Sequence, residues 1–232
     1  MKIAGSTALV TGANRGFGRH LAAELVARGA TVYAGARNPE SIDLPGVTPV
    51  RLDITDPASV AAAADLARDV NLLINNAGSG TGADLLDADL DPIRLELETH
   101  FFGTLSMVRA FTPIIARNGG GSILNVHSVL SWLHPADSGA YNAGKAAEWA
   151  LTNAVRGPLA ERNIRVVGLH VGYMDTDMTA HITAPKSDPA DIARITLDGV
   201  EADAYEIVAD DISRQVQAGL SGGIAALYPQ LP

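Results

Sequence analysis

The chain has 232 residues, 47% of them hydrophobic, which is enough to bury the full core of one α/β domain. The absence of cysteine excludes disulfide bonds and thiolate metal sites, and a net charge of −9 argues against non-specific nucleic-acid binding. The N-terminus lacks the pattern of a signal peptide, and no apolar run approaches the roughly 18 residues of a membrane span. We therefore expect a cytoplasmic protein without membrane or nucleic-acid partners.

Short apolar runs rich in Val, Ile and Leu alternate with longer Ala-rich stretches along the chain. This rhythm predicts a doubly wound α/β fold, in which helices cover both faces of a parallel sheet of six or seven strands, as a single domain over 1–232. The predicted strands are Thr7–Val10, Thr31–Ala34, Thr48–Leu52, Leu72–Asn75, Ser122–Val126, Arg165–Leu169 and a weaker candidate, Glu206–Ala209. The predicted helices are Phe17–Arg28, Ala58–Arg68, Pro92–Ile115, about Ala140–Arg162, and Pro189–Val200.

The segment 172–188 has no clear periodicity and is rich in Thr and Asp, so we predict a mobile substrate loop there. Three acidic residues of this segment, and a fourth just after it, lack the spacing that is typical of metal ligands. We therefore interpret them as solvated charges and helix caps and predict no metal site. These residues are Asp175, Asp177, Asp188 and Asp191.

A glycine-rich turn joins the first predicted strand to the first predicted helix, with the sequence Thr11-Gly12-Ala13-Asn14-Arg15-Gly16-Phe17-Gly18. Glycine lets the backbone approach a phosphate without interference from Cβ, and the helix N-terminus then faces the negative charge. A tight turn without a ligand is the alternative. The strand before the turn and the helix after it favour a dinucleotide site.

The residue after the second predicted strand indicates which dinucleotide binds. A free ribose 2′-hydroxyl is usually held by Asp or Glu, whereas a 2′-phosphate requires Arg. Here the strand leads into Arg37, and Arg15 in the glycine-rich turn lies within reach of the same phosphate. The sequence therefore favours NADP(H) over NAD(H), unless both arginines simply face solvent.

Tyr141 and Lys145 lie four residues apart on one predicted helix, hence on one face and about one turn apart. A nearby ammonium favours the phenolate form of a tyrosine, so we expect Lys145 to lower the pKa of Tyr141 and make it a general acid and base. Ser128 follows the fifth predicted strand, at the carboxyl edge where open α/β sheets bind ligands. It is therefore placed to orient a carbonyl oxygen beside Tyr141.

In this order the motifs resemble the short-chain dehydrogenase/reductase family, single-domain branch, over about residues 6–180. The matching motifs are Thr11-Gly12-x-x-x-Gly16-x-Gly18, Asp53, Asn75-Asn76-Ala77-Gly78, Ser128 and Tyr141-x-x-x-Lys145. The resemblance implies a Rossmann-like, NADP(H)-dependent oxidoreductase of carbonyl reductase or alcohol dehydrogenase type. Such an enzyme moves hydride between nicotinamide and a carbonyl or alcohol carbon. The apolar residues named below as candidates to line the pocket favour a small, apolar substrate.

The resemblance also implies which residues contact the cofactor. Asp53 and Ile54 would flank the adenine, residues 75–78 would form the cofactor floor, and Thr176 would contact the nicotinamide carboxamide. Arg37 resembles the arginine that selects NADP in the family. The expected cofactor-binding residues are Gly12, Asn14, Arg15, Gly16, Phe17, Gly18, Arg37, Asp53, Ile54, Asn76, Ala77, Gly78, Tyr141, Lys145, Gly172 and Thr176.

Three positions depart from the family pattern. His100 stands where the family carries an Asn that steadies a water in a proton relay, so it either replaces that amide as a fourth catalytic residue or is a hydrogen-bonded core histidine. His127 precedes Ser128, and strand alternation predicts a packing role for it. Val171 replaces a proline before Gly172, which should loosen the entry to the loop slightly without abolishing cofactor binding.

Other predictions concern the substrate, the assembly and rival functions. Candidates to line the substrate pocket are Trp132, Leu133, Tyr173, Met174 and Met178. Candidates for the interface of a homodimer or homotetramer, which the resemblance implies, are Phe101, Phe102, Leu105, Met107 and Trp149.

An NADP-binding regulatory or interaction protein without turnover is the alternative function, and a reaction on a C=N bond or a sugar is a third. Intact Ser128, Tyr141 and Lys145 argue against a regulator, and we expect no extra sugar-binding domain in a chain of 232 residues.

Overall fold

The computed structural model describes residues 1–231 and is built on a seven-stranded parallel sheet in the order β3-β2-β1-β4-β5-β6-β7. The order reverses between β1 and β4, and such a switch point is where doubly wound sheets bind ligands at their carboxyl edge. The strands are β1 (Thr7–Thr11), β2 (Thr31–Ala36), β3 (Val47–Arg51), β4 (Leu72–Asn75), β5 (Gly121–Val126), β6 (Ile164–His170) and β7 (Glu206–Val208). The predicted fold class is confirmed, and each predicted strand is found within two residues of its expected bounds.

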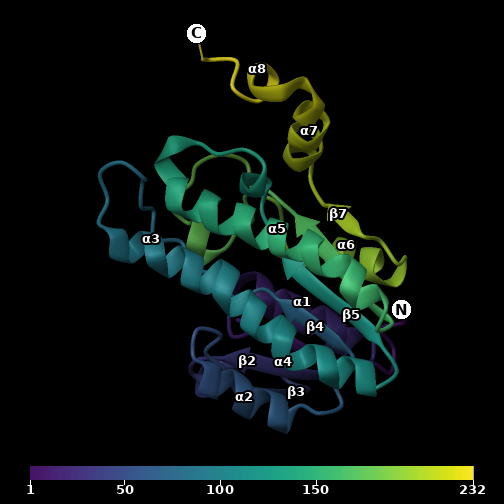
Figure 1. Cartoon of the computed structure of the whole chain (residues 1–232). Coiled ribbons are helices and arrows are strands. Elements are labelled where there is room, and N and C mark those ends of the chain that lie inside the picture. The colour runs from purple at the N-terminus through teal and green to yellow at the C-terminus, as the bar shows by residue number, and fades with distance from the viewer. Residues whose placement is uncertain (232) are drawn as a thin grey trace.

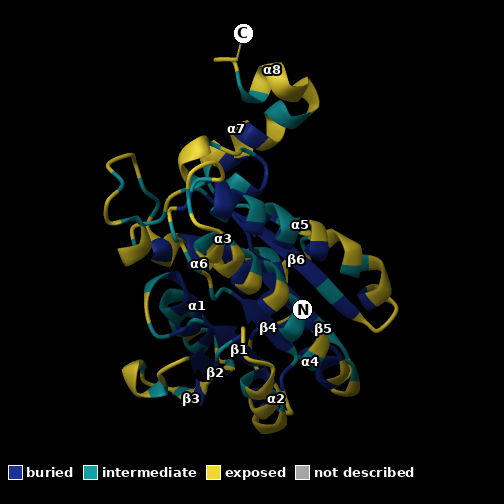
Figure 2. Ribbon diagram, turned by 60° about the vertical axis from the view of Figure 1, so that its left-hand side comes forward, coloured by how far each residue is buried: buried dark blue, intermediate teal, exposed yellow. Residues whose placement is uncertain are grey.

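Helices cover both faces of the sheet (Figures 1 and 2). On one face, α1 (Gly16–Ala27) and α6 (Pro189–Glu201) pack side by side against a core cluster that includes Val10 of β1. The other face carries α2 (Pro57–Leu66), α4 (Thr104–Arg117) and α5 (Gly139–Ala160), which contribute to a second core cluster. The continuous apolar strands of the sequence are therefore buried from both sides, as parallel strands require.

One predicted helix is not continuous. The pattern predicted a helix over Pro92–Ile115, but the structure has α3 (Leu90–Leu97), a π-helical segment η2 (Glu98–Gly103) and then α4. The widened turn buries His100, and π-helical turns are frequent at functional sites. The boundary arises from tertiary packing around His100, which periodicity does not report.

The two ends of the segment 172–188 lie side by side. Met174 and Ser187 form a parallel bridge, and a short 3₁₀ turn, η5 (Asp177–Thr179), lies between them. Two of the acidic side chains expected to be caps or solvated charges have such roles: Asp188 caps α6 by accepting from the Ala190 N–H, and Asp175 pairs with Lys186. Within residues 1–231 no group of three or more metal-ligating side chains is placed to hold an ion.

Two helices that the sequence analysis did not predict follow β7. They are α7 (Asp211–Gly219) and α8 (Gly223–Leu227), which extend from the body of the molecule (Figure 1). The Tyr228 hydroxyl accepts a hydrogen bond from the backbone N–H of His134 and so joins this segment to the loop before α5. Across residues 1–231, the helices fall short of the length and apolarity that crossing a bilayer demands.

Candidate active site

The turn after β1 has room for a close ligand only because three of its residues lack a side chain. A Cβ at Gly18 would lie 2.3 Å from the carbonyl oxygen of Gly12 and 2.4 Å from Nδ2 of Asn76. Gly12 and Gly16 have φ angles of 66° and 54°, in the left-handed region that favours glycine. The backbone therefore forms a cradle that matches the requirement for close approach of a phosphate group.

Two polar side chains hold this cradle against the end of β4. Asn76 Nδ2 donates to the carbonyl oxygens of Thr11 and Gly12, at 2.9 and 3.3 Å. The Thr11 hydroxyl accepts from the backbone N–H groups of Asn76 and Ala77, both at 2.9 Å. Asn76 and Ala77 therefore lie directly beneath the glycine-rich turn, as expected for the floor of a dinucleotide site.

The N-terminus of α1 is open to an anion. No side chain caps it and no acidic residue lies in its first turn, so its N–H groups are available to a phosphate. Arg15, directly before the helix, is 72% exposed and lies 3.8 Å from the carboxylate of Asp177. Asn14 donates to the hydroxyl of Ser41, and Phe17 is buried in the core. Of these three predicted residues, Arg15 is the one that carries a charge, and its exposed pairing with Asp177 leaves the guanidinium accessible to a ligand.

Arg37 is exposed just beyond the end of β2, near Asp53. Burial alone would raise the pKa of Asp53, but hydrogen bonds from Thr55 and the charge of Arg37 hold it below its usual value. Ile54 is buried next to Gly103, where a Cβ would lie 2.8 Å from the Ile54 side chain. A cation and a carboxylate thus flank the edge of the sheet where the adenine end of a dinucleotide is expected.

The remaining predicted cofactor residues lie on the loop after β6. Thr176 approaches the glycine-rich turn, with its side chain 3.8 Å from the position of a Cβ at Gly16. The backbone N–H of Gly172 donates to Asp210 at 2.6 Å, so it is already paired. Thr176 is therefore better placed than Gly172 to contact a bound dinucleotide.

Ser128, Tyr141 and Lys145 meet at the carboxyl edge. Ser128 follows β5 and its hydroxyl oxygen accepts from the Leu130 N–H at 3.1 Å, which leaves its proton to donate. On α5, Lys145 Nζ lies 5.9 Å from the ring centroid of Tyr141. The Ser128 side chain interacts with Tyr141 and favours its ionised form. The three predicted groups are thus brought together by β5 and α5.

Lys145 is buried and is held by two neighbouring oxygens. Its Nζ donates to the carbonyl oxygen of Val126 at 2.6 Å and to Glu148 Oε2 at 2.8 Å. The other oxygen of Glu148 accepts from the Thr104 hydroxyl at 3.0 Å. His127 Nδ1 lies 3.4 Å from Glu148, so His127 belongs to this polar cluster and does more than pack. We did not identify Glu148 from the sequence, although its i+3 spacing from Lys145 was a usable signal.

His100 lies at the site against a second buried carboxylate. Its Nε2 is 3.1 Å from Glu96 Oε2 and 3.0 Å from the carbonyl oxygen of Ser79. Both neighbours are acceptors, so Nε2 carries a proton. The ring meets the Tyr141 ring edge to face at 5.2 Å. Glu96 was also missed from the sequence, where its i−4 spacing from His100 marked it.

Glycines on two elements make room for the imidazole ring of His100. A Cβ at Gly78 would lie 2.8 Å from the ring, and one at Gly144 would lie 3.1 Å from it. The ring therefore occupies space that glycine leaves open between the floor of the site and α5. Its Nδ1 has no hydrogen-bond partner within residues 1–231.

The pKa of Tyr141 is raised, contrary to the expectation from the sequence. Burial is the largest cause, and the carboxylates of Glu148 and Glu96 add to the rise. Lys145 and Ser128 act in the expected opposite direction but do not prevail. The effect of Lys145 has the predicted direction, but the prediction left out burial, which is the largest cause, and the two nearby carboxylates.

The buried ionisable groups predict a loss of stability in acid. The pKa of His127 falls from 6.5 to about 4, because burial disfavours its charge, and those of Glu96 and Glu148 fall from 4.5 to about 2, because their partners outweigh burial. All three are lower in the folded than in the unfolded chain, so the unfolded chain binds more protons in acid. We expect the free energy of unfolding to decrease below about pH 6.5 and to continue decreasing towards pH 2. Urea unfolding between pH 7 and pH 3 measures this, and a constant free energy would contradict it.

Not every residue expected at the substrate pocket lies there. Trp132 is only 4% exposed and stacks on His170 with ring centroids 3.6 Å apart, so the expectation for it was wrong. Leu133 packs against the same cluster as Trp132, and Met174 packs against the core below α1 and α6. Tyr173 and Met178 are 40% and 49% exposed and stay candidates to contact a substrate.

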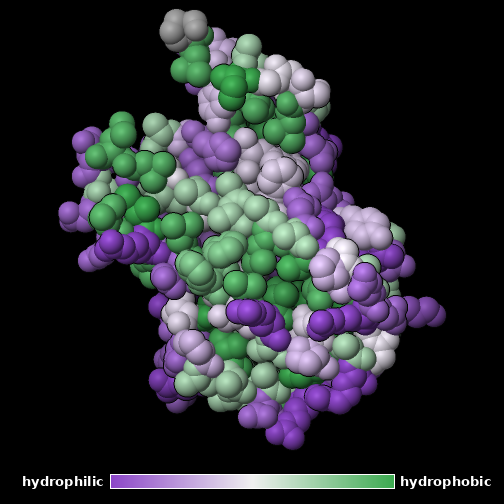
Figure 3. Space-filling view, viewed as in Figure 1, coloured by the Kyte–Doolittle hydropathy of each residue, from purple (hydrophilic) through white to green (hydrophobic). Residues whose placement is uncertain are grey.

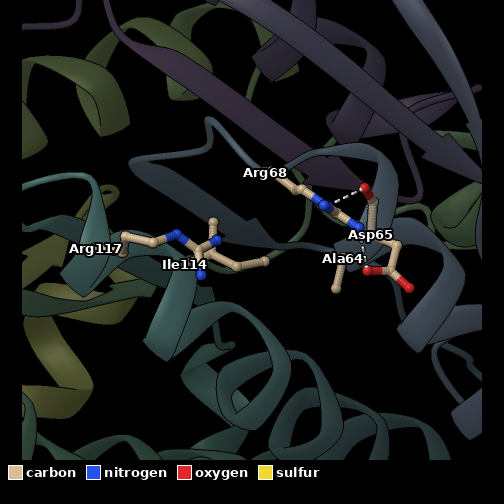
Figure 4. Close-up of a pocket in the computed structure, with 5 residues that line it drawn as sticks. All are labelled: Ala64, Asp65, Arg68, Ile114 and Arg117. Carbon is tan, nitrogen blue, oxygen red and sulfur yellow. Dashed lines mark hydrogen bonds and ion pairs between the residues drawn. The ribbon is translucent and has the colours of Figure 1, made fainter.

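A separate pocket lies where α2 and α4 end (Figure 4). In a parallel α/β fold the carboxyl ends of the helices lie at the amino edge of the sheet, opposite the glycine-rich turn. The cofactor and catalytic candidates are therefore remote from it. Its lining residues are Ala64, Asp65, Arg68, Ile114 and Arg117.

Comparison with known proteins identifies a family and similar structures for this chain. A family model described as short chain dehydrogenase matches residues 6–187. A crystal structure of a short chain dehydrogenase from Burkholderia cenocepacia J2315, in complex with NADP, has a TM-score of 0.95 and 38% identity, covering 100% of this chain and 99% of that chain.

Two curated proteins of Schizosaccharomyces pombe are also similar. The NADPH-dependent 1-acyldihydroxyacetone phosphate reductase is 33% identical over 177 residues, which cover 72% of this chain and 60% of the reductase. The NADP-dependent 3-hydroxy acid dehydrogenase is 28% identical over 240 residues, covering 91% of this chain and 93% of that protein. The match thus spans about three fifths of the reductase and nearly all of the dehydrogenase.

Proposed function

Because the chain belongs to the short-chain dehydrogenase/reductase family, we propose that it is an NADP(H)-dependent oxidoreductase of carbonyl or alcohol groups. Its substrate is small and apolar, and Tyr141 exchanges the proton. The observation that carries this proposal is the meeting of Ser128, Tyr141 and Lys145 at the sheet edge that also holds the glycine-rich cradle.

The cradle fits a dinucleotide phosphate, and the cations beside it fit a 2′-phosphate. The cofactor-binding residues proposed are those expected from the sequence, with the glycine-rich turn, Arg15 and Arg37 carrying the contacts to phosphate. When bound, NADPH supplies the hydride that a carbonyl carbon accepts. The family relatives named for NADP or NADPH, and the NADP complex of the Burkholderia protein, support this choice of cofactor.

The side chains of this chain handle the oxygen and the proton. The Ser128 hydroxyl, whose oxygen already accepts from Leu130, donates to the substrate oxygen and orients it. Tyr141 donates its phenolic proton to that oxygen during reduction and takes it back during oxidation. Lys145 is held in place by Val126 and Glu148, so its charge faces Tyr141 in a fixed geometry.

His100 is proposed as part of the path by which Tyr141 exchanges protons with solvent. Its ring lies against Tyr141, its Nε2 is fixed by Glu96 and the Ser79 carbonyl, and its Nδ1 has no partner in the described part of the chain. An unpaired imidazole nitrogen can hold a water. The same contacts also suit a purely structural histidine, which is the alternative.

The direct test of the proposal is NADPH consumption by the purified protein with a panel of aldehydes and ketones. We expect turnover of apolar carbonyl compounds with NADPH and slower turnover with NADH. Tight NADPH binding without turnover of any member of the panel would instead favour a regulatory or interaction protein.

The position and charge of Arg37 predict that the protein binds NADPH in preference to NADH. Replacing it by Ala removes a charge placed for the 2′-phosphate, so we expect NADPH affinity to fall about 10-fold or more while NADH affinity changes little. Fluorescence titration with each cofactor measures both constants. Arg94→Ala is the matched control, because Arg94 is an exposed arginine paired with Asp91 on α3. Equal losses for NADPH and NADH in Arg37→Ala would contradict the role of Arg37.

Assembly as a homodimer or homotetramer is proposed from an apolar surface over α4 and α5 (Figure 3). Phe102 is 49% exposed, which suits an interface. Met107 is fully buried and belongs to the core, and the Trp149 indole donates to Glu206. Of the predicted interface residues, Phe102 is thus the best supported. A cytoplasmic location stays a prediction.

A further inference from the structure

We infer that Asp210 is a positioning residue for the cofactor, because it clamps the root of the loop 172–188 and so sets where Thr176 lies beside the glycine-rich turn. The inference rests on the proposed function for the contact between Thr176 and the dinucleotide. It gives α7 a role that neither the catalytic side chains nor the glycine-rich turn assigns to it.

The root of the loop is held by hydrogen bonds on both sides. Val171 stands where the family pattern has a proline, so the sequence predicts a looser entry to the loop at this point. In the structure the carbonyl oxygen of Val171 accepts from the Val129 N–H at 3.0 Å. The Gly172 N–H donates to Asp210 Oδ2 at 2.6 Å. This hydrogen bond to a carboxylate is stronger than one between neutral groups, so Asp210 restrains the entry where the proline is missing.

The carboxylate of Asp210 is oriented by α7 and β7, independently of the loop. Its Oδ1 accepts from the Ser213 N–H at 3.0 Å and caps α7. The preceding residue, Ala209, donates its N–H to the carbonyl oxygen of His170 at 3.0 Å and so fixes the backbone beside β6. The two oxygens of Asp210 thus have different tasks, one in the helix cap and one at Gly172. One side chain therefore joins the start of α7 to the loop.

Gly172 lacks the side chain that would keep α7 at a distance. A Cβ at Gly172 would lie 2.6 Å from Cγ2 of Ile212 and 3.0 Å from Asp210 Oδ2. Such contacts are closer than a side chain tolerates, so a larger residue would push Ile212 or the carboxylate away. The close approach of α7 to the root of the loop therefore depends on glycine at this position.

Hydrogen bonds within the loop fix its internal shape. The Ser187 N–H donates to the Tyr173 carbonyl oxygen at 2.8 Å, and the Asp175 N–H donates to the Ser187 carbonyl oxygen at 3.0 Å. The Thr179 hydroxyl donates to the carbonyl oxygen of Met174 inside the same segment. The loop should therefore turn as a unit about its two ends, one at its root and one at α6. Its orientation relative to the sheet depends on how firmly those ends are held.

Thr176 is the residue through which a change at the root reaches the cofactor site. It lies four residues after Gly172, and its side chain is 3.8 Å from the position of a Cβ at Gly16. When the loop turns about its root, Thr176 moves relative to the glycine-rich turn and to a dinucleotide bound there. Ser128 and Tyr141 belong to β5 and α5 and keep their positions. Losing the clamp should therefore weaken cofactor binding and leave the chemical step nearly unchanged.

Asp210→Ser tests the clamp with the helix cap retained. Serine caps helices well, but its single uncharged oxygen replaces the two of the carboxylate, so the charge-assisted bond to Gly172 is lost. We expect the dissociation constant for NADPH to rise about 10-fold, measured by fluorescence titration, and kcat at saturating NADPH to stay within a few-fold of the parent. Unchanged NADPH affinity in folded Asp210→Ser would overturn the inference, as would a loss confined to kcat.

Asp211→Ala is the matched control for Asp210→Ser. Asp211 is the first residue of α7, its side chain is 88% exposed, and its carboxylate pairs with Arg214 of the same helix at 2.6 Å. The variant removes a negative charge from the same helical turn, so NADPH affinity should stay near that of the parent. An equal loss in Asp211→Ala would show that the charge at the start of α7 is responsible, and the clamp would be refuted.

Amide hydrogen exchange of the free protein tests the clamp without cofactor or substrate. We expect the Gly172 amide to be protected in the parent, and exchange across 172–180 to speed up at least about 10-fold in Asp210→Ser, with α7 still protected. No acceleration would overturn the inference. If Asp210→Ser does not fold, the parent decides, since exchange of the Gly172 amide at the rate of an unstructured peptide would show that no clamp exists. A parent that binds no NADPH would defeat the proposed function, whereas the exchange data would still decide whether Asp210 clamps the loop.

Discussion

Replacing Tyr141 by Phe is expected to reduce the kcat of carbonyl reduction by about 10²–10⁴-fold, the usual contribution of a positioned general acid. The phenylalanine ring retains the packing against His100, where the two rings meet edge to face at 5.2 Å. What it removes is the hydroxyl whose proton burial and two carboxylates keep in place. The loss should therefore appear in kcat, measured as NADPH consumption, while the dissociation constant for NADPH changes little.

Tyr205→Phe is the matched control for Tyr141→Phe. Tyr205 directly precedes β7, is 58% exposed and lies against Arg156 and Arg165, so it has no role in the proposed site. It should keep kcat within a few-fold of the parent. Full activity in Tyr141→Phe, or equal losses in the two variants, would refute Tyr141 as the proton donor.

Replacing Gly18 by Ala is expected to abolish NADPH binding in the measurable range and to lower the melting temperature. The new Cβ would lie 2.3 Å from the Gly12 carbonyl oxygen and 2.4 Å from Asn76, so the turn or the start of α1 must move. Overpacking of this kind costs about 1–3 kcal/mol of stability. The larger effect falls on the phosphate cradle, because its N–H groups lose their alignment. Fluorescence titration with NADPH and a thermal melt measure the two effects.

A second glycine gives the control. Gly157 lies in α5, and a Cβ there would meet no atom within 4 Å. Gly157→Ala should bind NADPH normally and melt at the same or a slightly higher temperature, because alanine favours a helix. Normal NADPH binding by Gly18→Ala would show that the cradle does not hold the cofactor.

The fold could be predicted because its strands carry an unmistakable pattern. Ala8, Leu9 and Val10 of β1 are completely buried, and such continuous apolar runs separated by helices are typical of a parallel sheet. The π-helical segment η2 could not be predicted, since it depends on how His100 packs between glycines from other elements. The helices after β7 were missed because α7 and α8 are short and bury little apolar surface.

The site was predictable in its motifs but not in its electrostatics. Tyr141 and Lys145 are recognisable by spacing on one helix, and Ser128 by its place after a strand. The i+3 spacing of Glu148 from Lys145 was overlooked, and its burial follows from the meeting of α4, α5 and β5, which the sequence does not show. Trp132 was assigned to the pocket for a similar reason, since the sequence does not reveal the His170 ring on which it stacks. In both cases a contact with a residue distant in the sequence determines the burial, Thr104 for Glu148 and His170 for Trp132.

The proposed function requires that hydride passes directly from NADPH to the substrate carbon, and isotope labelling tests this step in one turnover. The protein is mixed with an equimolar amount of NADPH deuterated at both C4 positions and with an apolar ketone, and the product is analysed by mass spectrometry. We expect an alcohol with one deuterium on its carbinol carbon, formed by the parent chain and not by Tyr141→Phe within the same time. Alcohol without deuterium, or bound NADPH that gives no alcohol with any carbonyl compound of the panel, would contradict it.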